Sequence, residues 1–260
     1  MECNVAQQLN NNTVIVRATS PFVNIIDLAD IHRGAKLSNK KNLKTMVSLI
    51  AETENLYVIG GGDGEEHATT TSKSSLMDEE CHGADQVEEL ADILQPIAKK
   101  ILFIKDGNHG SQRSLRHDNM APERLLAKIL GIKYIRGIGI ALINVNKNLY
   151  SIAAIHTPRK TEATFDWLPC DAFFIEHQHT KYTNRLPIPY LNRTEHKWAT
   201  HDRLYLRSGS FLDWGGYAME NYRPLLSEGS QILRLSGEKN KWDMRVYERV
   251  KDFKEDMEAK

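Results

Sequence analysis

The chain has 260 residues, of which 41% are hydrophobic and 26% charged, so it can bury a substantial core. Its 34 basic and 34 acidic side chains cancel, which excludes a global positive field that would hold nucleic acid indiscriminately. No apolar run approaches the roughly 20 residues of a membrane span. With no secretory signal at its start and three widely spaced cysteines (Cys3, Cys81 and Cys170), we expect a cytoplasmic protein that forms a single domain over residues 1–260.

Short apolar runs followed by stretches of helical spacing fill the first 180 residues, a rhythm typical of α/β proteins. The predicted strands, in chain order, are 23–28, 55–59, 101–104, 138–145, 149–155 and 172–175. The predicted helices are 42–51, 87–100 and 122–130, the last of which begins at a proline and ends before a glycine. The polar segment 60–83 has no period and is predicted to be irregular.

Beyond residue 180 the chain becomes more polar and contains Pro187 and Pro189. Strand-like runs follow at 204–207, 231–235 and 244–250, and we expect them to complete the sheet structure of the same domain. The tail 251–260 is charged throughout and is predicted to be a frayed or solvated helix end.

Five predicted strand ends carry residue types that bind metal ions. They are Asp30-Ile31-His32, Gly62-Asp63, Gly107-Asn108-His109, His156 and His177-Gln178-His179. The interval from Asp30 to Asp63 is 33 residues, from Asp63 to Asn108 it is 45, and from Asn108 to His156 it is 48. Each is long enough for a crossover and a returning strand. Because loops at the carboxyl ends of strands converge in open α/β sheets, these side chains predict a divalent-metal site.

Each motif alone has a plainer explanation. A His-x-His pair in a strand places both rings on one face, where they are usually solvated. An Asp-x-His after a strand is more often a turn, and Gly60-Gly61-Gly62 can be a flexible turn. The glycines are not a dinucleotide fingerprint, since Glu65 and Glu66 would repel a pyrophosphate. It is the combination of the five motifs in one order that favours a metal site.

This order resembles the calcineurin-like metallophosphoesterases, whose signature runs Asp-x-His, Gly-Asp, Gly-Asn-His, His and Gly-His-x-His. The match covers residues 30–179, and Gly209-Ser210-Phe211 resembles a strand that often follows the last motif. Within the superfamily the chain is most similar to the branch of repair exonucleases and phage phosphoesterases. The resemblance implies an α/β fold, a four-layer αββα sandwich of two mixed β-sheets flanked by helices, with two metals between the sheet edges.

The resemblance also implies roles for the residues of the motifs. One metal would be held by Asp30, His32 and His179, the other by Asn108, His156 and His177, and the two would share Asp63. His109 would be the proton donor or transition-state stabiliser, because an imidazole with a pKa of about 6.5 can be protonated near neutrality. The cofactors would be two divalent ions, manganese first, with iron, zinc, nickel or magnesium as alternatives.

Three residues depart from the family pattern. Glu176 stands where a glycine usually precedes His-x-His, Thr157 follows His156 where glycine is common, and Gly110 stands where an acidic residue is usual. Glu176 either points outward or orients a ligand by accepting an imidazole N–H. Gly110 removes an acidic partner from the site.

The resemblance implies a dinuclear phosphoesterase that hydrolyses phosphodiesters, of nucleic acid or nucleotides, through attack by a metal-bridging hydroxide. Hydrolysis of phosphomonoesters is the close alternative, and a degenerate module that binds metal without turnover is another. His117-Asp118 and His201-Asp202 would also suit the His-Asp hydrolases, although those motifs sit in helices. We expect a phosphoester substrate such as DNA or RNA as partner, no membrane, and a homodimer as in related nucleases.

Three further features bear on the substrate. Between residues 181 and 207, six basic residues alternate with aromatic ones, which suits either a phosphate-and-base surface or a solvated loop; they are Lys181, Arg185, Arg193, Lys197, Arg203 and Arg207, among Tyr182, Tyr190, Trp198 and Tyr205. Arg113 and Arg116 either grip a phosphate or are solvated. The loop 64–83, with His67 and His82, either overhangs the site or is mobile.

Overall fold

The computed structural model describes residues 9–70, 72, 76–117, 119–158, 162–192, 196–216, 219, 225–239 and 242–259, so Cys3, Asp118 and Arg193 lie outside the described residues. Sheet A contains β1 (Thr13–Ala18), β6 (Gly139–Val145), β7 (Asn148–His156), β8 (Ala172–Glu176), β9 (Tyr182–Asn192) and β10 (Lys197–Arg207). Sheet B contains β2 (Phe22–Leu28), β3 (Leu56–Gly60), β4 (Ile101–Lys105), β5 (Tyr134–Ile135), β11 (Ile232–Ser236) and β12 (Met244–Tyr247).

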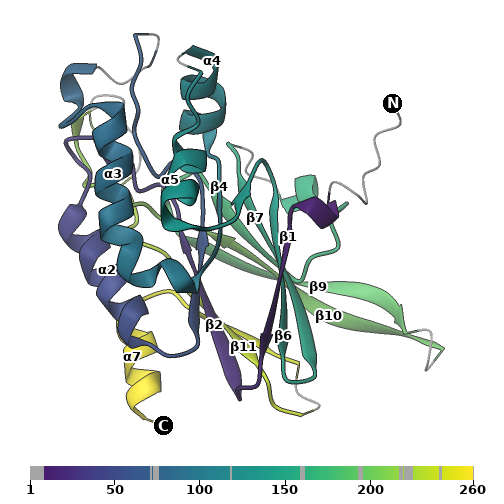
Figure 1. Ribbon diagram of the computed structural model, residues 1–260. Coiled ribbons are helices and arrows are strands. Elements are labelled where there is room, and N and C mark those ends of the chain that lie inside the picture. The colour runs from purple at the N-terminus through teal and green to yellow at the C-terminus, as the bar shows by residue number, and fades with distance from the viewer. Residues whose placement is uncertain are drawn as a thin grey trace.

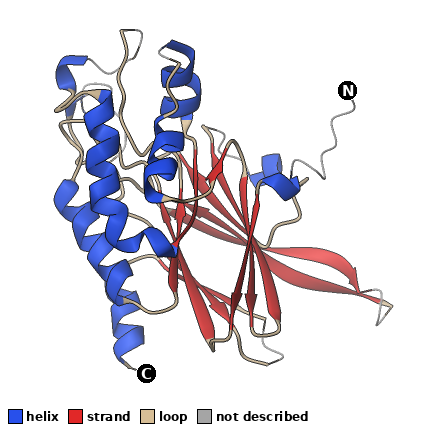
Figure 2. Ribbon diagram, viewed as in Figure 1, coloured by secondary structure: helices blue, strands red, loops and turns tan. Residues whose placement is uncertain are grey.

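The helices are α2 (Lys40–Glu52), α3 (Gly83–Leu94), α5 (Pro122–Leu130) and α7 (Val250–Glu258), with shorter turns η1 (Leu76–Asp78), η2 (Gln95–Lys100), η3 (His109–Ser114), α4 (Leu115–His117) and η4 (Glu162–Phe165). The strand order is β1-β6-β7-β8-β10-β9 in sheet A and β12-β11-β2-β3-β4-β5 in sheet B, and both sheets mix parallel and antiparallel pairs. The predicted α/β fold of two mixed sheets with flanking helices is therefore confirmed (Figures 1 and 2).

The space between the sheets is filled by alternate residues of their strands, because side chains of a strand point to opposite faces in turn. Residues such as Ile25, Phe103, Ile152, Phe174 and Leu206 form this apolar layer and are fully buried. It fixes the distance between the sheets and so the distance between the loops at their ends.

The longer helices lie against sheet B (Figure 1), where their apolar stripes meet the outer face of its strands. In α2 the buried residues Leu43, Met46, Val47 and Ile50 recur at helical spacing, and the Asn39 side chain caps the helix by accepting from the backbone N–H of Asn42 at 2.9 Å. At 13 residues α2 is the longest described helix, and no helix in the described part of the chain has the length and apolarity to cross a bilayer.

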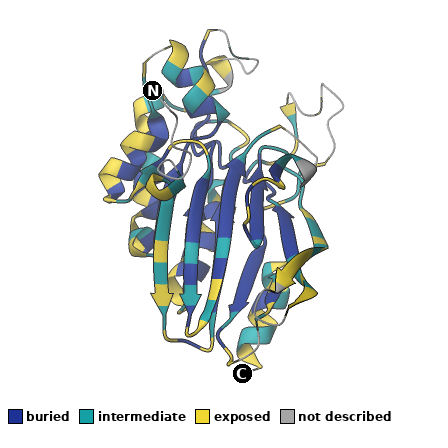
Figure 3. Ribbon diagram, turned by 90° about the vertical axis from the view of Figure 1, so that its right-hand side faces the viewer, coloured by how far each residue is buried: buried dark blue, intermediate teal, exposed yellow. Residues whose placement is uncertain are grey.

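The outer face of sheet A is covered differently. Viewed from that side, its central strands consist mostly of buried residues (Figure 3). Phe165, Leu168 and Cys170, in and after η4, pack with Phe173 and Tyr205 of the strands beneath. A short irregular segment thus closes over this part of the sheet.

The structure differs from the sequence prediction at the sheet edges. Strand β1 was not predicted, and β9 was missed because prolines break strand patterns. Pro187 and Pro189 are tolerated because β9 pairs only with β10 and is an edge strand. Gly209-Ser210-Phe211 is not a strand, since β10 already ends at Arg207. Helix α3 begins at Gly83, earlier than expected, and continues after Leu94 as the tighter η2, where Pro96 lacks an N–H.

The last helix of the chain, α7, packs against sheet B and is not a solvated tail. The prediction of a helix was right, but Phe253 in α7 is buried against sheet B, with its ring 5.4 Å from that of Tyr247. Asp256 accepts from Tyr247 Oη at 2.9 Å and pairs with Arg234, which lies over the ring of Phe22. Phe253, with the partly buried Val250 and Met257 of the same helix, therefore packs α7 on the sheet.

Register at the strand ends is the feature that positions the site. In sheet B, Leu28 of β2 pairs with Gly60 of β3, and Gly60 with Ile104 of β4, all in parallel. In sheet A, His156 of β7 pairs in parallel with Glu176 of β8. The five loops that follow these strands hence leave from one edge of the two sheets.

We predict that Phe253→Ala lowers the free energy of unfolding by about 3–5 kcal/mol, because it empties a buried ring site. Urea denaturation followed by circular dichroism measures this. Lys254→Ala, at an exposed position of the same helix, is the matched control and should change stability by less than about 0.5 kcal/mol. Equal stability of the two variants would mean that α7 is not anchored by this residue.

Candidate metal centre

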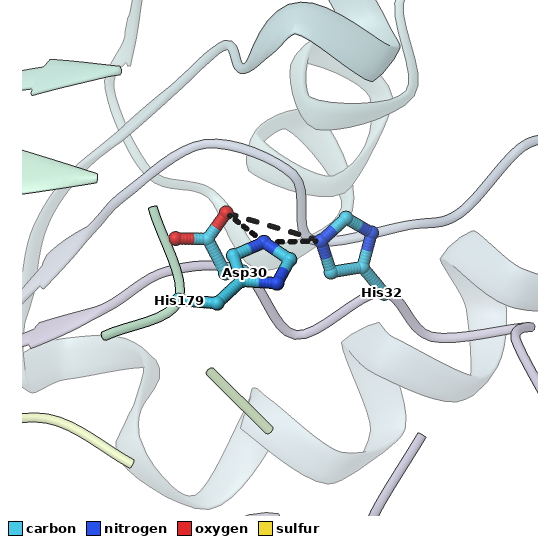
Figure 4. A group of neighbouring side chains, drawn as sticks. All are labelled: Asp30, His32 and His179. Atoms are coloured by element: carbon cyan, nitrogen blue, oxygen red, sulfur yellow. Dashed lines mark hydrogen bonds and ion pairs between the residues drawn. The ribbon is translucent and has the colours of Figure 1, made fainter. Parts of the chain in front are cut away.

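A first group of ligand atoms comes from the loops after β2 and β8. Nε2 of His32 and Nε2 of His179 lie 3.2 Å apart, and Asp30 Oδ1 lies 3.2 Å from the His179 nitrogen and 3.8 Å from that of His32 (Figure 4). Atoms bound to one ion at about 2.1 Å lie about 3 Å apart, so these three atoms have the spacing of a ligand set. The resemblance assigned them to one metal.

A second group comes from β7 and the loops after β3, β4 and β8. His156 Nε2 is 3.0 Å from Asp63 Oδ2, 3.0 Å from Asn108 Oδ1 and 3.3 Å from His177 Nδ1. These are the residues expected at the other metal, together with Asp63. All seven sequence-predicted ligand residues are therefore brought into two adjacent groups.

The groups touch through their carboxylates. Asp30 Oδ1 is 4.0 Å from His156 Nε2, and Asp30 Oδ2 accepts from the backbone N–H of His177 at 2.9 Å. Asp63 turns Oδ2 toward the second group, while its Oδ1 accepts from the backbone N–H of His109 at 2.8 Å. Buried oxygens and ring nitrogens that converge in this way suit two divalent ions of mixed hard and borderline character.

The backbone of the site is unusual. Five candidate ligands, Asp30, His32, Asp63, His177 and His179, have φ between 49° and 89°. Side chains with a Cβ rarely adopt this left-handed region, at a cost of about 1–3 kcal/mol each. Such strain is retained where the surrounding structure fixes it for function, and here it aims the side chains of loops 30–32, 63 and 177–179 inward.

Opposite charges stabilise the ionised carboxylates. Burial would raise the pKa of Asp30, but the facing imidazoles of His179, His156 and His32 outweigh it and lower the pKa to about 2. Burial likewise opposes ionisation of Asp63, yet the imidazoles of His109, His156 and His32 hold its pKa well below the usual range. Both carboxylates are therefore negative at neutral pH and attract cations.

His109 lies beside the groups, as expected, but not in the expected ionisation state. Burial lowers the pKa of His109 to about 4, against the opposing charge of Asp63. Its Nδ1 is 2.9 Å from the carbonyl oxygen of Glu66 and its Nε2 is 2.9 Å from Arg113 Nη2. A neutral ring that donates from Nδ1 and accepts at Nε2 satisfies both contacts. Protonation near neutrality is therefore the wrong expectation for the protein without a ligand.

Glu66 is a residue of the site that sequence reasoning missed. Its Oε2 accepts from His32 Nδ1 at 2.8 Å, which leaves His32 Nε2 for an ion, and its Oε1 accepts from Arg113 Nη1 at 3.0 Å. The irregular loop after β3 thus forms a wall of the site. An acidic residue three positions after Asp63 was the only signal, and such residues are too common to be diagnostic.

The acid missing at Gly110 is replaced from another element. A Cβ at Gly110 would overlap Glu123 Oε2, because the side chain of Glu123 in α5 occupies that space. Glu123 Oε1 accepts from the backbone N–H of Gly107 at 3.2 Å, beside the ligand loop, and burial with the charge of Asp63 raises its pKa to about 7. The other two departures differ: Thr157 is partly exposed after β7, and Glu176 points inward and is fully buried.

Several other candidates lie outside the ligand groups. Arg116, His82 and His117 are exposed, while His67 is buried beside α3, where its backbone N–H donates to Gln86 Oε1 at 2.9 Å. His201 lies on β10 with its ring 5.4 Å from that of Tyr190, so the His-Asp hydrolase alternative gains no support.

The basic and aromatic stretch is an antiparallel hairpin, β9 and β10, that projects beyond the body of the molecule (Figure 1). Three of its cations have partners within the protein: Arg185 pairs with Asp202 at 2.7 Å, Arg203 with Asp166 at 3.5 Å, and Arg207 lies over the Tyr182 ring. Trp198 is 73% exposed, whereas Tyr205 is buried in the core.

The sequence matches no protein-family model and no curated protein. Among solved structures, it is similar to vacuolar protein sorting 29 from Cryptosporidium parvum at 13% identity, covering 88% of this chain and 100% of that chain with a TM-score of 0.43. The zinc complex of vacuolar protein sorting 29 from Entamoeba histolytica is 11% identical, covers 86% of this chain and 98% of that chain, and has a TM-score of 0.39. A conserved uncharacterized protein from Streptococcus pneumoniae, described as a predicted phosphoesterase, is 10% identical. It covers 88% of this chain and 99% of that chain, with a TM-score of 0.33. These likenesses are too distant to assign a family or an activity.

We predict that the protein binds two divalent ions and that His179→Ala and His177→Ala each lose one of them, because each removes a nitrogen from a different group. Isothermal titration with Mn²⁺ or Zn²⁺, with metal analysis of the dialysed protein, gives the stoichiometry. His201→Ala, outside both groups, is the control and should keep both ions. Two ions retained in both ligand variants would refute the assignment.

We predict that Gly110→Asp, which restores the acid usual in the family, destabilises the protein by about 1–3 kcal/mol because it overlaps Glu123. In the double variant Gly110→Asp with Glu123→Ala, the space is released, so the loss should be smaller than the sum of the single losses. Thermal or urea denaturation of the four proteins measures the coupling. Strict additivity would show that the two residues do not compete for space.

Proposed function

We propose that this chain is a dinuclear metal-dependent phosphoesterase of the calcineurin-like superfamily. The observation that carries the proposal is the convergence of Asp30, His32 and His179 with Asp63, His156 and His177 at one sheet edge, with His109 beside them. When bound, two dications would neutralise the phosphoryl oxygens and activate a water molecule. We favour manganese, with zinc, iron, nickel or magnesium as alternatives.

The protein's own residues supply positioning and charge. Asp30 and Asp63 would balance the positive charge of the ions. Asp63 turns Oδ2 toward the second group. Asp30 Oδ1 lies 3.2 Å from His179 Nε2 and 4.0 Å from His156 Nε2. His109 Nε2 lies 3.8 Å from Asp63 Oδ2, so a phosphoryl group bound beside Asp63 would lie within reach of this ring. Because the ring is neutral without ligand, we propose that the charge of a bound phosphate raises its pKa and so lets it assist the leaving oxygen.

Arg113 is placed to meet the substrate's charge. Its Nη2 contacts His109 Nε2 and its Nη1 contacts Glu66, so the guanidinium lies at the rim of the same site. A phosphate that approaches His109 would compete for these donors, which Arg can present in pairs. Of the two candidate arginines for gripping a phosphate, Arg113 lies at the site and Arg116 is exposed. Because one guanidinium matches one negative charge, we favour a phosphodiester, which carries one, over a phosphomonoester.

We predict turnover of bis(p-nitrophenyl) phosphate with Mn²⁺, faster than turnover of p-nitrophenyl phosphate, and none after chelation. Assays with Mn²⁺, Mg²⁺ and Zn²⁺ check this. The reverse preference would favour the phosphomonoesterase. An absence of turnover with every metal, in protein that binds two ions, would favour a module that binds metal without catalysis.

His109→Ala should keep both ions and lower kcat by about 10²–10⁴-fold, because it removes a group that acts on the transition state but not a ligand. His82→Ala, at an exposed histidine, is the matched control. Normal turnover in His109→Ala would remove this residue from the mechanism.

For the natural substrate we propose nucleic acid or a nucleotide. The support is the family resemblance together with the ring of Trp198 on the hairpin, which is 73% exposed and offers a face on which a base would stack. A screen of linear and single-stranded DNA, RNA and cyclic nucleotides separates these classes. Hydrolysis of simple esters alone would oppose a nucleic-acid substrate.

A further inference from the structure

Glu176 is the departure from the family pattern that the fold encloses most completely. It is the last residue of β8, lies in register with His156 of β7, and is fully buried between the two sheets. A glycine at this place would put no charge there. The buried carboxylate must therefore be compensated by its neighbours.

Three groups surround one oxygen of this carboxylate. Glu176 Oε2 accepts from the backbone N–H of Gly62 at 3.1 Å and from Lys105 Nζ at 3.2 Å, and it lies 3.2 Å from His156 Nδ1. Lys105 is itself buried, and its ammonium also donates to the carbonyl oxygen of Asp106 at 2.7 Å. The lysine of sheet B thus neutralises the glutamate of sheet A.

The space for the carboxylate comes from Gly61. A Cβ on Gly61 would overlap Ala29 Cβ and would lie 2.8 Å from Asp27 Oδ1 and 2.9 Å from Glu176 Cδ, closer than side chains tolerate. The glycine usual before His-x-His is absent, and a glycine on the facing strand end makes the room instead. Gly61 and Lys105 together accommodate the carboxylate.

The two nitrogens of His156 face different partners. Nδ1 is buried, makes no hydrogen bond of regular geometry to a described residue and lies 3.2 Å from Glu176 Oε2, while Nε2 lies 3.0 Å from Asp63 Oδ2 in the second ligand group. A neutral imidazole carries one proton and can ligate an ion only through the other nitrogen. A carboxylate behind Nδ1 favours the tautomer in which that nitrogen keeps the proton.

We infer that Glu176 is the positioning residue of His156: neutralised by Lys105, its carboxylate keeps the imidazole proton on Nδ1 and so reserves Nε2 for the ion. This inference rests on the proposed function for the ligand role of His156. Glu176 touches neither ion nor substrate and acts only through the ring. In the first ligand group Glu66 stands behind the corresponding nitrogen of His32, where its Oε2 accepts from Nδ1 at 2.8 Å, a closer contact than that of Glu176 with His156.

The rival explanation is that Glu176 only balances Lys105, and the test removes that charge first. In the background Lys105→Met, Glu176→Gln keeps a neutral acceptor oxygen of the same shape, whereas Glu176→Met keeps the volume without an acceptor oxygen. The two double variants are therefore uncharged at both positions and differ in the amide of Gln, whose oxygen accepts strongly and whose NH2 donates, against the weakly accepting thioether of Met.

Titration with Zn²⁺ should show that the second ion binds about 10–100-fold more weakly to the Glu176→Met double variant than to the Glu176→Gln double variant. Long-range ¹H–¹⁵N NMR of the zinc-loaded proteins should show a proton on His156 Nδ1 with Glu176→Gln and a weakened or absent signal with Glu176→Met. His156→Ala assigns the signal, and the ring of His32, held by Glu66, is the internal control.

Equal affinities with equal Nδ1–H signals in the two double variants would overturn the inference and leave Glu176 as a charge partner of Lys105. If the double variants do not fold, the zinc-loaded wild-type protein decides, since Nδ1 as its metal-bound nitrogen would also overturn the inference. Neither the zinc titration nor the NMR measurement depends on phosphoester hydrolysis. An inactive protein with the expected affinities and tautomer would therefore refute the proposed function alone.

Discussion

The parallel register of the strands at one edge of the two sheets is the constraint on which the rest of the structure depends. In sheet B, Leu28 and Gly60, the last residues of β2 and β3, lie level with Ile104, the last but one of β4. In sheet A, β7 and β8 end together at His156 and Glu176. The apolar layer between the sheets sets how far apart these ends lie. A shift of one residue in any of these strands would turn its ligand side chains away from the site.

This arrangement buries several charged side chains close together. Burial of a charge is unfavourable, and groups of opposite charge around the site compensate for it. The carboxylates of Asp30 and Asp63 face imidazoles, Arg113 meets Glu66, and Lys105 meets Glu176. Unpaired, each buried charge would destabilise the fold by several kcal/mol. Strain in the left-handed ligand residues adds to this cost, so the site is held by the packing around it and not by its own local preferences.

Two residues that set this chain apart from the signature it resembles are explained by their neighbours in the fold. The acid absent at Gly110 is supplied from α5 by Glu123, and the acid gained at Glu176 is matched by Lys105 from β4. In both cases a glycine leaves the room that the carboxylate occupies.

How much of this was predictable depends on how local each feature is. The motif residues could be assigned to strand ends because apolar runs and polar breaks are local patterns, and helix 122–130 was correct because Pro122 and Gly131 mark its two ends. Strand β9 could not be predicted, since its prolines are acceptable only at an edge and the sequence does not state which strand is an edge. Burial of Phe253 likewise required the face of sheet B.

The sequence by itself determined which residue types are present at each strand end, and therefore the ligand chemistry: carboxylate, amide and imidazole in one order along the chain. Only the tertiary structure decided the partners of those ligands. Glu66, Glu123 and Lys105 reach His32, Gly107 and Glu176 across 34, 16 and 71 residues of chain. No local pattern encodes such contacts, because they arise from the packing of two sheets and a helix whose relative positions are fixed only when the whole core forms.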